Sequence, residues 1–327
     1  MPPSAVPQRS PASVSHLADA LPAAGVRYAS IQTASYSGAT LLCFMLASHP
    51  DVASVGEVDG LIPAEDPDLY LCSCGEPVRV CAFWSEVAEA MAGRGEAFDP
   101  GRWETRFDFD GPRLMRRLRA GSLGTAAANA TRDRIFQALP WERPRWERLT
   151  RRNEAFARTI LAVSGKRVLV DSSKDGLRLA AFRNLGGMPV SAIHLVRDVR
   201  GVVASRLRRG VPISAGEAAR QWLRLNRRIE ANLAGLPPPS TVRIRYEDLC
   251  RDPAPVLAAV HRAIGVVPSP PPADFRSTPH HIIGNVMRLG SASTIEPDES
   301  WRSFLTPDQI AAVDAAAGDL RARYGYP

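Results

Sequence analysis

Tyr28-Ala-Ser-Ile-Gln-Thr-Ala-Ser-Tyr-Ser-Gly-Ala-Thr-Leu-Leu-Cys-Phe-Met-Leu46 is the stretch of sequence that decides the fold. It begins with a short apolar run, continues through a loop of small and hydroxyl residues, and ends in an apolar helical pattern. That order predicts a strand, a tight loop and the N-terminus of a helix. Because backbone N–H groups point outward at such a turn, the stretch predicts an anion site.

Side chains in the loop support this interpretation. Ser35, Ser37 and Thr40 offer hydroxyl donors, and Gly38 lets a ligand approach the backbone closely. The loop is therefore suited to a phosphate or sulfate group. An ordinary helix N-cap at Ser35 or Ser37 would produce a similar sequence, and this alternative stays open.

The loop lacks one feature of the enzymes that use nucleoside triphosphates. A Walker A loop places a lysine before its Ser or Thr, whereas Ala39 precedes Thr40 here. A kinase-like enzyme is therefore disfavoured, although a related P-loop fold is not.

The length and charge of the chain narrow the class of protein. Its 327 residues suffice for one large α/β domain, and its net charge of +7 favours anionic ligands. No RNA-binding or zinc-finger pattern accompanies that charge, so we expect no nucleic acid partner. We find no signal peptide and no apolar run that could span a bilayer, which predicts a cytoplasmic protein. The oligomeric state is left open, and a homo-oligomer is compatible with the sequence.

Four short apolar runs at wide spacing predict parallel strands. Each is followed by a loop and a helical pattern, as in crossover units around a buried sheet. The predicted strands are Val26–Gln32, Arg167–Asp171, Val190–Val196 and Thr241–Tyr246.

These runs predict an α/β domain over residues 25–327. Residues 1–24 are rich in Pro, Ala and Ser, which predicts a loose tail. A long insertion follows, from about residue 61 to about residue 165. We expect it to be helical and to form a cap or an acceptor-binding lobe.

Three of the five cysteines gather in the insertion, in Cys72-Ser-Cys-Gly-Glu-Pro-Val-Arg-Val-Cys81. An odd total argues against a secreted disulfide framework. A zinc site needs a fourth ligand, and none lies at the usual spacing. A thiol-rich structural loop is therefore favoured over metal binding by Cys72, Cys74 and Cys81.

Two charged residues lie close to the predicted anion loop. Glu57 follows the helix that Pro50 terminates, and there a carboxylate can act as general base for an incoming hydroxyl or amine. Lys174 lies just past the end of a predicted strand, where it can neutralise charge on a leaving-group oxygen. A surface acid and an exposed turn lysine are the alternatives.

A third group of residues predicts a second anion site. Arg197 ends a strand, and Ser205 falls on the second turn of a helix predicted to begin near Val199. A guanidinium and a hydroxyl that face one cleft can clamp a phosphate. His194, which alternates within the strand, is interpreted as a buried packing residue.

These motifs, in this order, resemble those of the sulfotransferases that use 3′-phosphoadenosine 5′-phosphosulfate (PAPS). Ser35-Tyr-Ser-Gly-Ala-Thr-Leu-Leu42 is similar to the family's 5′-phosphosulfate loop. Leu195-Val-Arg-Asp-Val-Arg200, with Ser205, is similar to its 3′-phosphate motif. Tyr246-Glu-Asp-Leu249 and Gly284-Asn-Val-Met-Arg288 match patterns further downstream.

The resemblance covers most of residues 25–60 and 165–305 and is poor in the insertion. The run from Ser37-Gly to His49-Pro-Asp-Val and Gly56-Glu57 is most similar to the tyrosylprotein sulfotransferases and many bacterial relatives. In those enzymes the glutamate of the Gly-Glu pair is the catalytic base.

The resemblance implies a P-loop-like fold and transfer of a sulfuryl group from PAPS to a hydroxyl, or to an amine, of a small molecule, glycan or peptide. This chemistry requires no metal. The resemblance implies Glu57 as the base, and Lys174, from its position just past a predicted strand, is expected to be the second catalytic residue. The residues expected to bind PAPS are Ser35, Tyr36, Ser37, Gly38, Ala39, Thr40, Leu41, Arg197, Ser205, Tyr246, Asn285 and Arg288.

Two positions depart from the family's pattern. Tyr36 stands where the family usually has Arg or Lys, and Ala39 replaces a usual Ser or Thr. Lys174 or an arginine of the insertion can replace the missing cation. The alternative is a protein that binds PAPS or its product without catalysing transfer.

Overall fold

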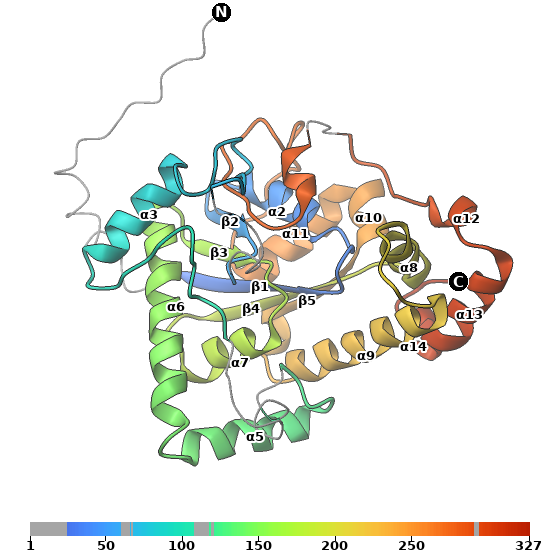
Figure 1. Ribbon diagram of the computed structural model, residues 1–327, viewed down its shortest axis with the longest axis horizontal. Helices are drawn as coiled ribbons and strands as arrows, with labels where there is room; N and C mark the ends of the chain where they lie inside the picture. Colours follow the sequence, from blue (N-terminus) through green and yellow to red (C-terminus); the bar gives the residue numbers. More distant parts are fainter. Residues whose placement is uncertain (1–24, 60–65, 67, 108–117, 119–120, 291–293) are drawn as a thin grey trace, which may run out of the picture.

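One parallel sheet covered by helices organises the chain (Figure 1). The computed structural model describes residues 25–59, 66, 68–107, 118, 121–290 and 294–327. The tail predicted over residues 1–24 lies outside the described residues, as do parts of the predicted insertion. The predicted α/β class with a parallel sheet is confirmed.

The described part of the sheet has five strands, each parallel to its neighbours, in the order β2-β3-β1-β4-β5. Because all of them point the same way, their carboxyl ends lie along one edge of the sheet. The strands are β1 Arg27–Thr33, β2 Val52–Gly56, β3 Val168–Asp171, β4 Val190–Val196 and β5 Thr241–Arg245.

All four predicted strands are confirmed to within a residue or two at their ends. The prediction misses β2, whose Val-Ala-Ser-Val-Gly sequence is short and lies only two residues after Pro50. It also places Tyr246 in the last strand, whereas Tyr246 begins a helix directly after β5. His194 is buried as expected, and its Nε2 lies 2.9 Å from Asn226 Oδ1.

Helices account for most of the remaining described chain. None of the described helices combines the length and the apolar character that crossing a bilayer requires. The helices are α2 Ala39–Ala47, α3 Ala82–Ala92, α5 Ala126–Ala138, α6 Arg143–Ser164, α7 Gly176–Leu185, α8 Val199–Arg208, α9 Ala215–Leu233, α10 Tyr246–Arg251, α11 Pro253–Ile264, α12 Trp301–Phe304, α13 Pro307–Ala317 and α14 Asp319–Arg323, with 3₁₀ turns η2 Pro238–Ser240 and η3 Val286–Leu289.

The two faces of the sheet bury different helices. Ala29 and Ile31 of β1 pack in one core with α2, α10 and α11. Tyr28, on the opposite face, packs in a second core with α3 and α6. Figure 1 shows α2, α10 and α11 on one side of the strands and α6 and α7 on the other. This alternation is what a strand buried on both faces requires.

A segment from near the C-terminus runs along the outer edge of β2. Ile283 N–H donates to the Val55 carbonyl at 2.9 Å, and Glu57 N–H donates to the Ile283 carbonyl at 3.2 Å. Gly56 and Ile283 form an isolated parallel bridge. The segment therefore covers an edge that would otherwise expose unpaired backbone groups.

This close pairing predicts that Gly56 tolerates no side chain. Its φ is 87°, and an added Cβ would lie 2.0 Å from the Ile283 carbonyl oxygen. At Gly165, with φ of 66°, an added Cβ would meet nothing within 4 Å. We expect Gly165→Ala to cost about 1–2 kcal/mol from backbone strain alone. Gly56→Ala should cost about 1–3 kcal/mol more because of the clash. Urea unfolding of both variants measures the difference, and equal losses would contradict the pairing.

Candidate active site

A cleft of about 950 Å³ brings together nearly all of the residues that sequence analysis singles out. Ser37 does not line it: this side chain is 2% exposed, and its Oγ is buried without a hydrogen-bond partner among the described residues. The predicted residues that line the cleft are Ser35, Tyr36, Gly38, Ala39, Thr40, Leu41, Glu57, Lys174, Arg197, Ser205, Tyr246, Asn285 and Arg288.

The topology of the sheet explains this gathering. The glycine-containing loop follows β1, and Glu57 follows β2. Lys174 comes three residues after β3, Arg197 directly after β4, and Tyr246 directly after β5. Each strand therefore supplies a lining residue at its carboxyl end, which is where open parallel sheets bind their ligands.

The loop after β1 leads into helix α2 without a side-chain cap. The N-cap is Gly38, with φ of 89°, so the alternative of a cap at Ser35 or Ser37 is wrong. The first N–H groups of a helix have no partner within the helix, and they remain available to an anion. Tyr246 packs on the loop so closely that a Cβ at Gly38 would lie 2.4 Å from its ring.

Glu57 and Lys174 form an ion pair inside the cleft. Lys174 Nζ donates to Glu57 Oε1 at 2.5 Å, and the side chains of Lys174 and Glu57 are 20% and 31% exposed, respectively. Gly284 packs against the Glu57 side chain, since an added Cβ there would lie 2.9 Å from Glu57 Cγ. The pair thus has a fixed position and remains open to solvent.

A buried carboxylate fixes the turn that carries Lys174. Asp171 accepts hydrogen bonds from Ser173 N–H at 2.7 Å and Ser173 Oγ at 2.5 Å. It also accepts one from Tyr28 Oη at 2.6 Å, and Arg178 Nε lies 3.5 Å away. Lys174 itself has φ of 62°, a left-handed conformation that is uncommon outside glycine.

Arg197 is held by the loop and by the C-terminal region. Its Nη1 donates to the Tyr36 carbonyl at 2.7 Å, and its Nη2 donates to Asp298 Oδ2 at 3.0 Å. The guanidinium lies 4.7 Å from the centre of the Tyr246 ring. Burial raises the pKa of Asp298, but hydrogen bonds from Ser300 and Arg197 outweigh it and leave that pKa lowered.

Positive charge dominates the lining of the cleft. The described lining residues include two acids, Glu57 and Asp298, and five basic residues, Lys174, Arg197, Arg208, Arg209 and Arg288. Such an excess in a concave site attracts anions.

Sequence analysis overlooks Tyr70, which belongs to the insertion and lines the cleft from a distant segment. Asp298 also lines the cleft, from a segment near the C-terminus. Arg209, at the end of α8, lies 5.1 Å from the centre of the Tyr36 ring and supplies a cation beside the loop. Ser35 and Tyr36 also line a second cleft, of about 540 Å³, together with Arg206, Arg224 and Arg228.

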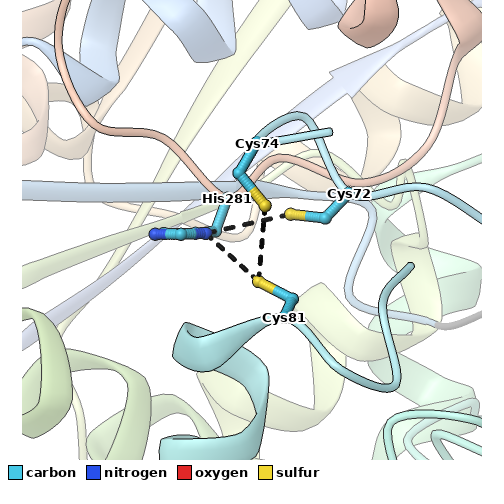
Figure 2. A group of neighbouring side chains, drawn as sticks. All are labelled: Cys72, Cys74, Cys81 and His281. Carbon is cyan, nitrogen blue, oxygen red and sulfur yellow. Dashed lines mark hydrogen bonds between the residues drawn. The ribbon is translucent and has the colours of Figure 1, made fainter. Parts of the chain in front are cut away.

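A group of potential metal ligands lies beside the cleft (Figure 2). Cys72, Cys74 and Cys81 come from the insertion, and His281 joins them from some 200 residues away. Sequence analysis finds no fourth ligand because local spacing cannot reveal one so distant. The neighbouring Cys72 thiol lowers the pKa of the Cys81 thiol.

Comparison with known proteins identifies the fold. No protein-family model matches the chain, and no curated protein is similar enough to match it. Among solved structures, the sulfotransferase domain of the Synechococcus PCC 7002 olefin synthase superposes with a TM-score of 0.54 and 21% identity, over 93% of this chain and 96% of that chain. The protein therefore shares the fold of a sulfotransferase domain.

Two more distant structures were also found. A sulfotransferase domain from the curacin biosynthetic pathway has a TM-score of 0.49 and 17% identity, over 92% of this chain and 98% of that one. A sulfotransferase from Mycobacterium tuberculosis has a TM-score of 0.40 and 17% identity, over 80% and 72% of the two chains.

The left-handed conformation of Lys174 predicts an unusual ranking of two variants. Lys174→Ala and Lys174→Gly both remove the ion pair, but only glycine also relieves the strain. We expect the Lys174→Gly variant to be more stable than the Lys174→Ala variant by about 1 kcal/mol in urea unfolding. At Lys166, whose φ is not positive, the order should reverse because glycine is the more flexible residue. A Lys174→Gly variant no more stable than Lys174→Ala would contradict the strain.

Proposed function

We propose that this protein is a sulfotransferase that moves a sulfuryl group from PAPS to a hydroxyl, or to an amine, of a small-molecule, glycan or peptide acceptor. The observation that carries the proposal is the shared cleft. It is lined by the uncapped N-terminus of α2, by the ion pair of Glu57 and Lys174, and by Arg197 and Ser205. The fold, which is that of a sulfotransferase domain, supports the same chemistry.

The proposed reaction is an in-line displacement at sulfur. An acceptor oxygen forms a new bond to sulfur while the bond from sulfur to the 5′-phosphate oxygen breaks. Glu57 takes the acceptor proton, and the leaving oxygen stays with 3′,5′-bisphosphoadenosine, the second product. The reaction needs no change of oxidation state and no metal ion.

The loop after β1 and Lys174 are proposed to act on the 5′ end of the donor. The loop N–H groups bind the phosphosulfate through the partial positive charge of the helix N-terminus. Lys174, now 2.5 Å from Glu57, can turn to the leaving oxygen as negative charge develops there. Such a movement also leaves the Glu57 carboxylate free to accept the proton.

Arg197 and Ser205 are proposed to bind the 3′-phosphate, which distinguishes PAPS from ATP. The Asp298 carboxylate now occupies one side of Arg197. A phosphate can replace it there, since phosphate and carboxylate both bind the planar guanidinium through paired hydrogen bonds. Tyr246, Asn285 and Arg288, which complete the lining, are proposed as further contacts to the donor.

A PAPS-binding protein without catalytic activity is the second candidate. Tyr36 favours it, because the family usually has a cation at this position. Arg209, however, lies over the Tyr36 ring and Lys174 lies in the same cleft, so two cations can substitute. Among the described residues of the insertion, no arginine lines the cleft, which leaves Lys174 and Arg209 as the candidates.

Nucleotide binding tests the 3′-phosphate assignment. We expect 3′,5′-bisphosphoadenosine to bind in calorimetry and Arg197→Ala to weaken it by roughly 10- to 100-fold, as expected for a lost charged hydrogen bond. Asp298→Asn should strengthen binding because it removes the competing carboxylate. Arg220→Ala is the matched control, since Arg220 pairs with Glu217 on α9 and does not line the cleft. Equal affinity for AMP and for the bisphosphate would exclude the assignment.

Transfer of labelled sulfate tests the base. With ³⁵S-labelled PAPS and a metabolite extract as the source of acceptors, we expect Glu57→Gln to lower transfer by about 10²–10⁴-fold while nucleotide affinity persists. Glu89→Gln, an exposed change on α3, should be neutral. Mass spectrometry of the sulfated product then identifies the acceptor. Full transfer by Glu57→Gln would exclude Glu57 as the base, and binding without transfer by the wild type would favour the second candidate.

A further inference from the structure

Three cysteines and one histidine converge beside the edge of the sheet. Cys81 Sγ lies 3.3 Å from His281 Nδ1 and 3.6 Å from Cys74 Sγ. Cys72 Sγ lies 3.9 Å from the same ring nitrogen. Figure 2 shows the three thiols and the imidazole pointing toward one another. All four ligand atoms lie within 4.8 Å of one another.

These separations match those of a four-coordinate zinc site. With Zn–S bonds of about 2.3 Å and Zn–N bonds of about 2.0–2.1 Å, a tetrahedron places its ligand atoms about 3.5–3.8 Å apart. The observed atoms need to move by only about 1 Å or less to enclose an ion of this size. Three thiolates and one imidazole are also a ligand set that Zn²⁺ commonly takes in structural sites.

A tight turn follows the first cysteine of the group. Cys72 N–H donates to the Glu76 carbonyl at 2.8 Å, and Gly75 N–H donates to the Cys72 carbonyl at 2.9 Å. Gly75, with φ of 94°, closes the tight turn that brings the first two cysteines together.

The imidazole is positioned from the other side. Phe83 stacks on the His281 ring with centroids 4.6 Å apart and an angle of 3° between the planes. Ser73 pairs with the same segment, since its N–H donates to the Ile282 carbonyl at 3.0 Å. Cys74 is exposed, whereas Cys72 and Cys81 are buried, so an ion has a path from solvent.

We propose that Cys72, Cys74, Cys81 and His281 bind one Zn²⁺ ion in a closed structural site. Binding replaces the thiol protons by metal–sulfur bonds, so up to three protons leave to solvent and no electron is transferred. His281 binds through Nδ1 as the neutral imidazole. Because all four positions are filled by protein ligands, the ion has no open position for catalysis.

The ion would clamp the insertion to the wall of the cleft. His281 lies two residues before Ile283, whose backbone pairs with both Val55 and Glu57. The next residue, Gly284, packs against the Glu57 side chain and exchanges hydrogen bonds with Tyr70 Oη at 2.8 and 3.2 Å. The site therefore fixes the backbone that positions Glu57, and it acts on the cleft only through that backbone.

A disulfide between Cys74 and Cys81 is the competing use of these thiols. It would leave the Cys72 thiol and the His281 ring nitrogen without a covalent or metal partner, although both face the same point. Zinc uses all four groups, and for that reason we favour it.

Metal analysis of the full chain tests the site directly. After purification with zinc and a thiol reductant, followed by gel filtration, we expect about one zinc ion per chain. Replacement by Co²⁺ should produce the d–d absorption of a tetrahedral ion and a thiolate-to-cobalt charge-transfer band. A strong chelator should lower the urea midpoint of the wild-type protein, because zinc binds the folded chain more tightly than the unfolded one.

Matched variants separate ligands from neighbours. Cys74→Ser, at the exposed ligand, and His281→Ala should lose zinc on dialysis and no longer respond to the chelator. Cys250→Ala and His280→Ala should keep one zinc ion, since Cys250 lies in another core and His280 bonds to Ser73 instead. A wild-type protein that retains no zinc and gives no tetrahedral Co²⁺ spectrum would overturn the proposal. A Cys74–Cys81 disulfide in protein purified with reductant would do the same.

Discussion

Parallel pairing of all five described strands is the constraint on which the candidate site depends. In a parallel sheet, every residue that directly follows a strand lies at the edge formed by the carboxyl ends of the strands. Four of these positions carry Glu57, Lys174, Arg197 and Tyr246, and the fifth is the loop that begins α2. Chemistry that is scattered over more than 200 residues of sequence thereby meets in one cleft. The helices on both faces stabilise this arrangement by burying the strands.

The backbone pairing of Ile283 with the outer edge of β2 adds a further segment to the sheet and to the wall of the cleft. It covers the β2 edge of the sheet at Val55 and Glu57, and it places the residues that follow against Glu57. Arg288 then donates to the carbonyls of Gly284 and Leu71, and its guanidinium lies 4.1 Å from the centre of the Tyr70 ring. The proposed zinc ion would add a further link between this layer and the segment that carries Cys72, Cys74 and Cys81.

Sequence reasoning reaches those features that depend on local order along the chain. An apolar run followed by Ser-Tyr-Ser-Gly predicts both β1 and the anion loop, and Arg197 with Ser205 follows from the helix predicted at Val199. Sequence reasoning fails where packing between distant segments determines the structure. β2 is too short and too poor in large apolar side chains to be recognised, and it forms because β3 and Ile283 pair with it on either side. His281 and Asp298 reach their partners from distant segments, so the spacing of residues in the sequence does not reveal these contacts.

The balance of charge in the cleft bears on which donor it suits. Each of its two described carboxylates already neutralises one cation, Glu57 with Lys174 and Asp298 with Arg197. The five basic and two acidic lining residues leave a net of three positive charges for a ligand. A ligand with a single negative charge can pair with only one of them. A donor with a phosphosulfate at one end and a second phosphate at the other brings charge to both groups of cations at once, which is the distribution that the proposed role of PAPS requires.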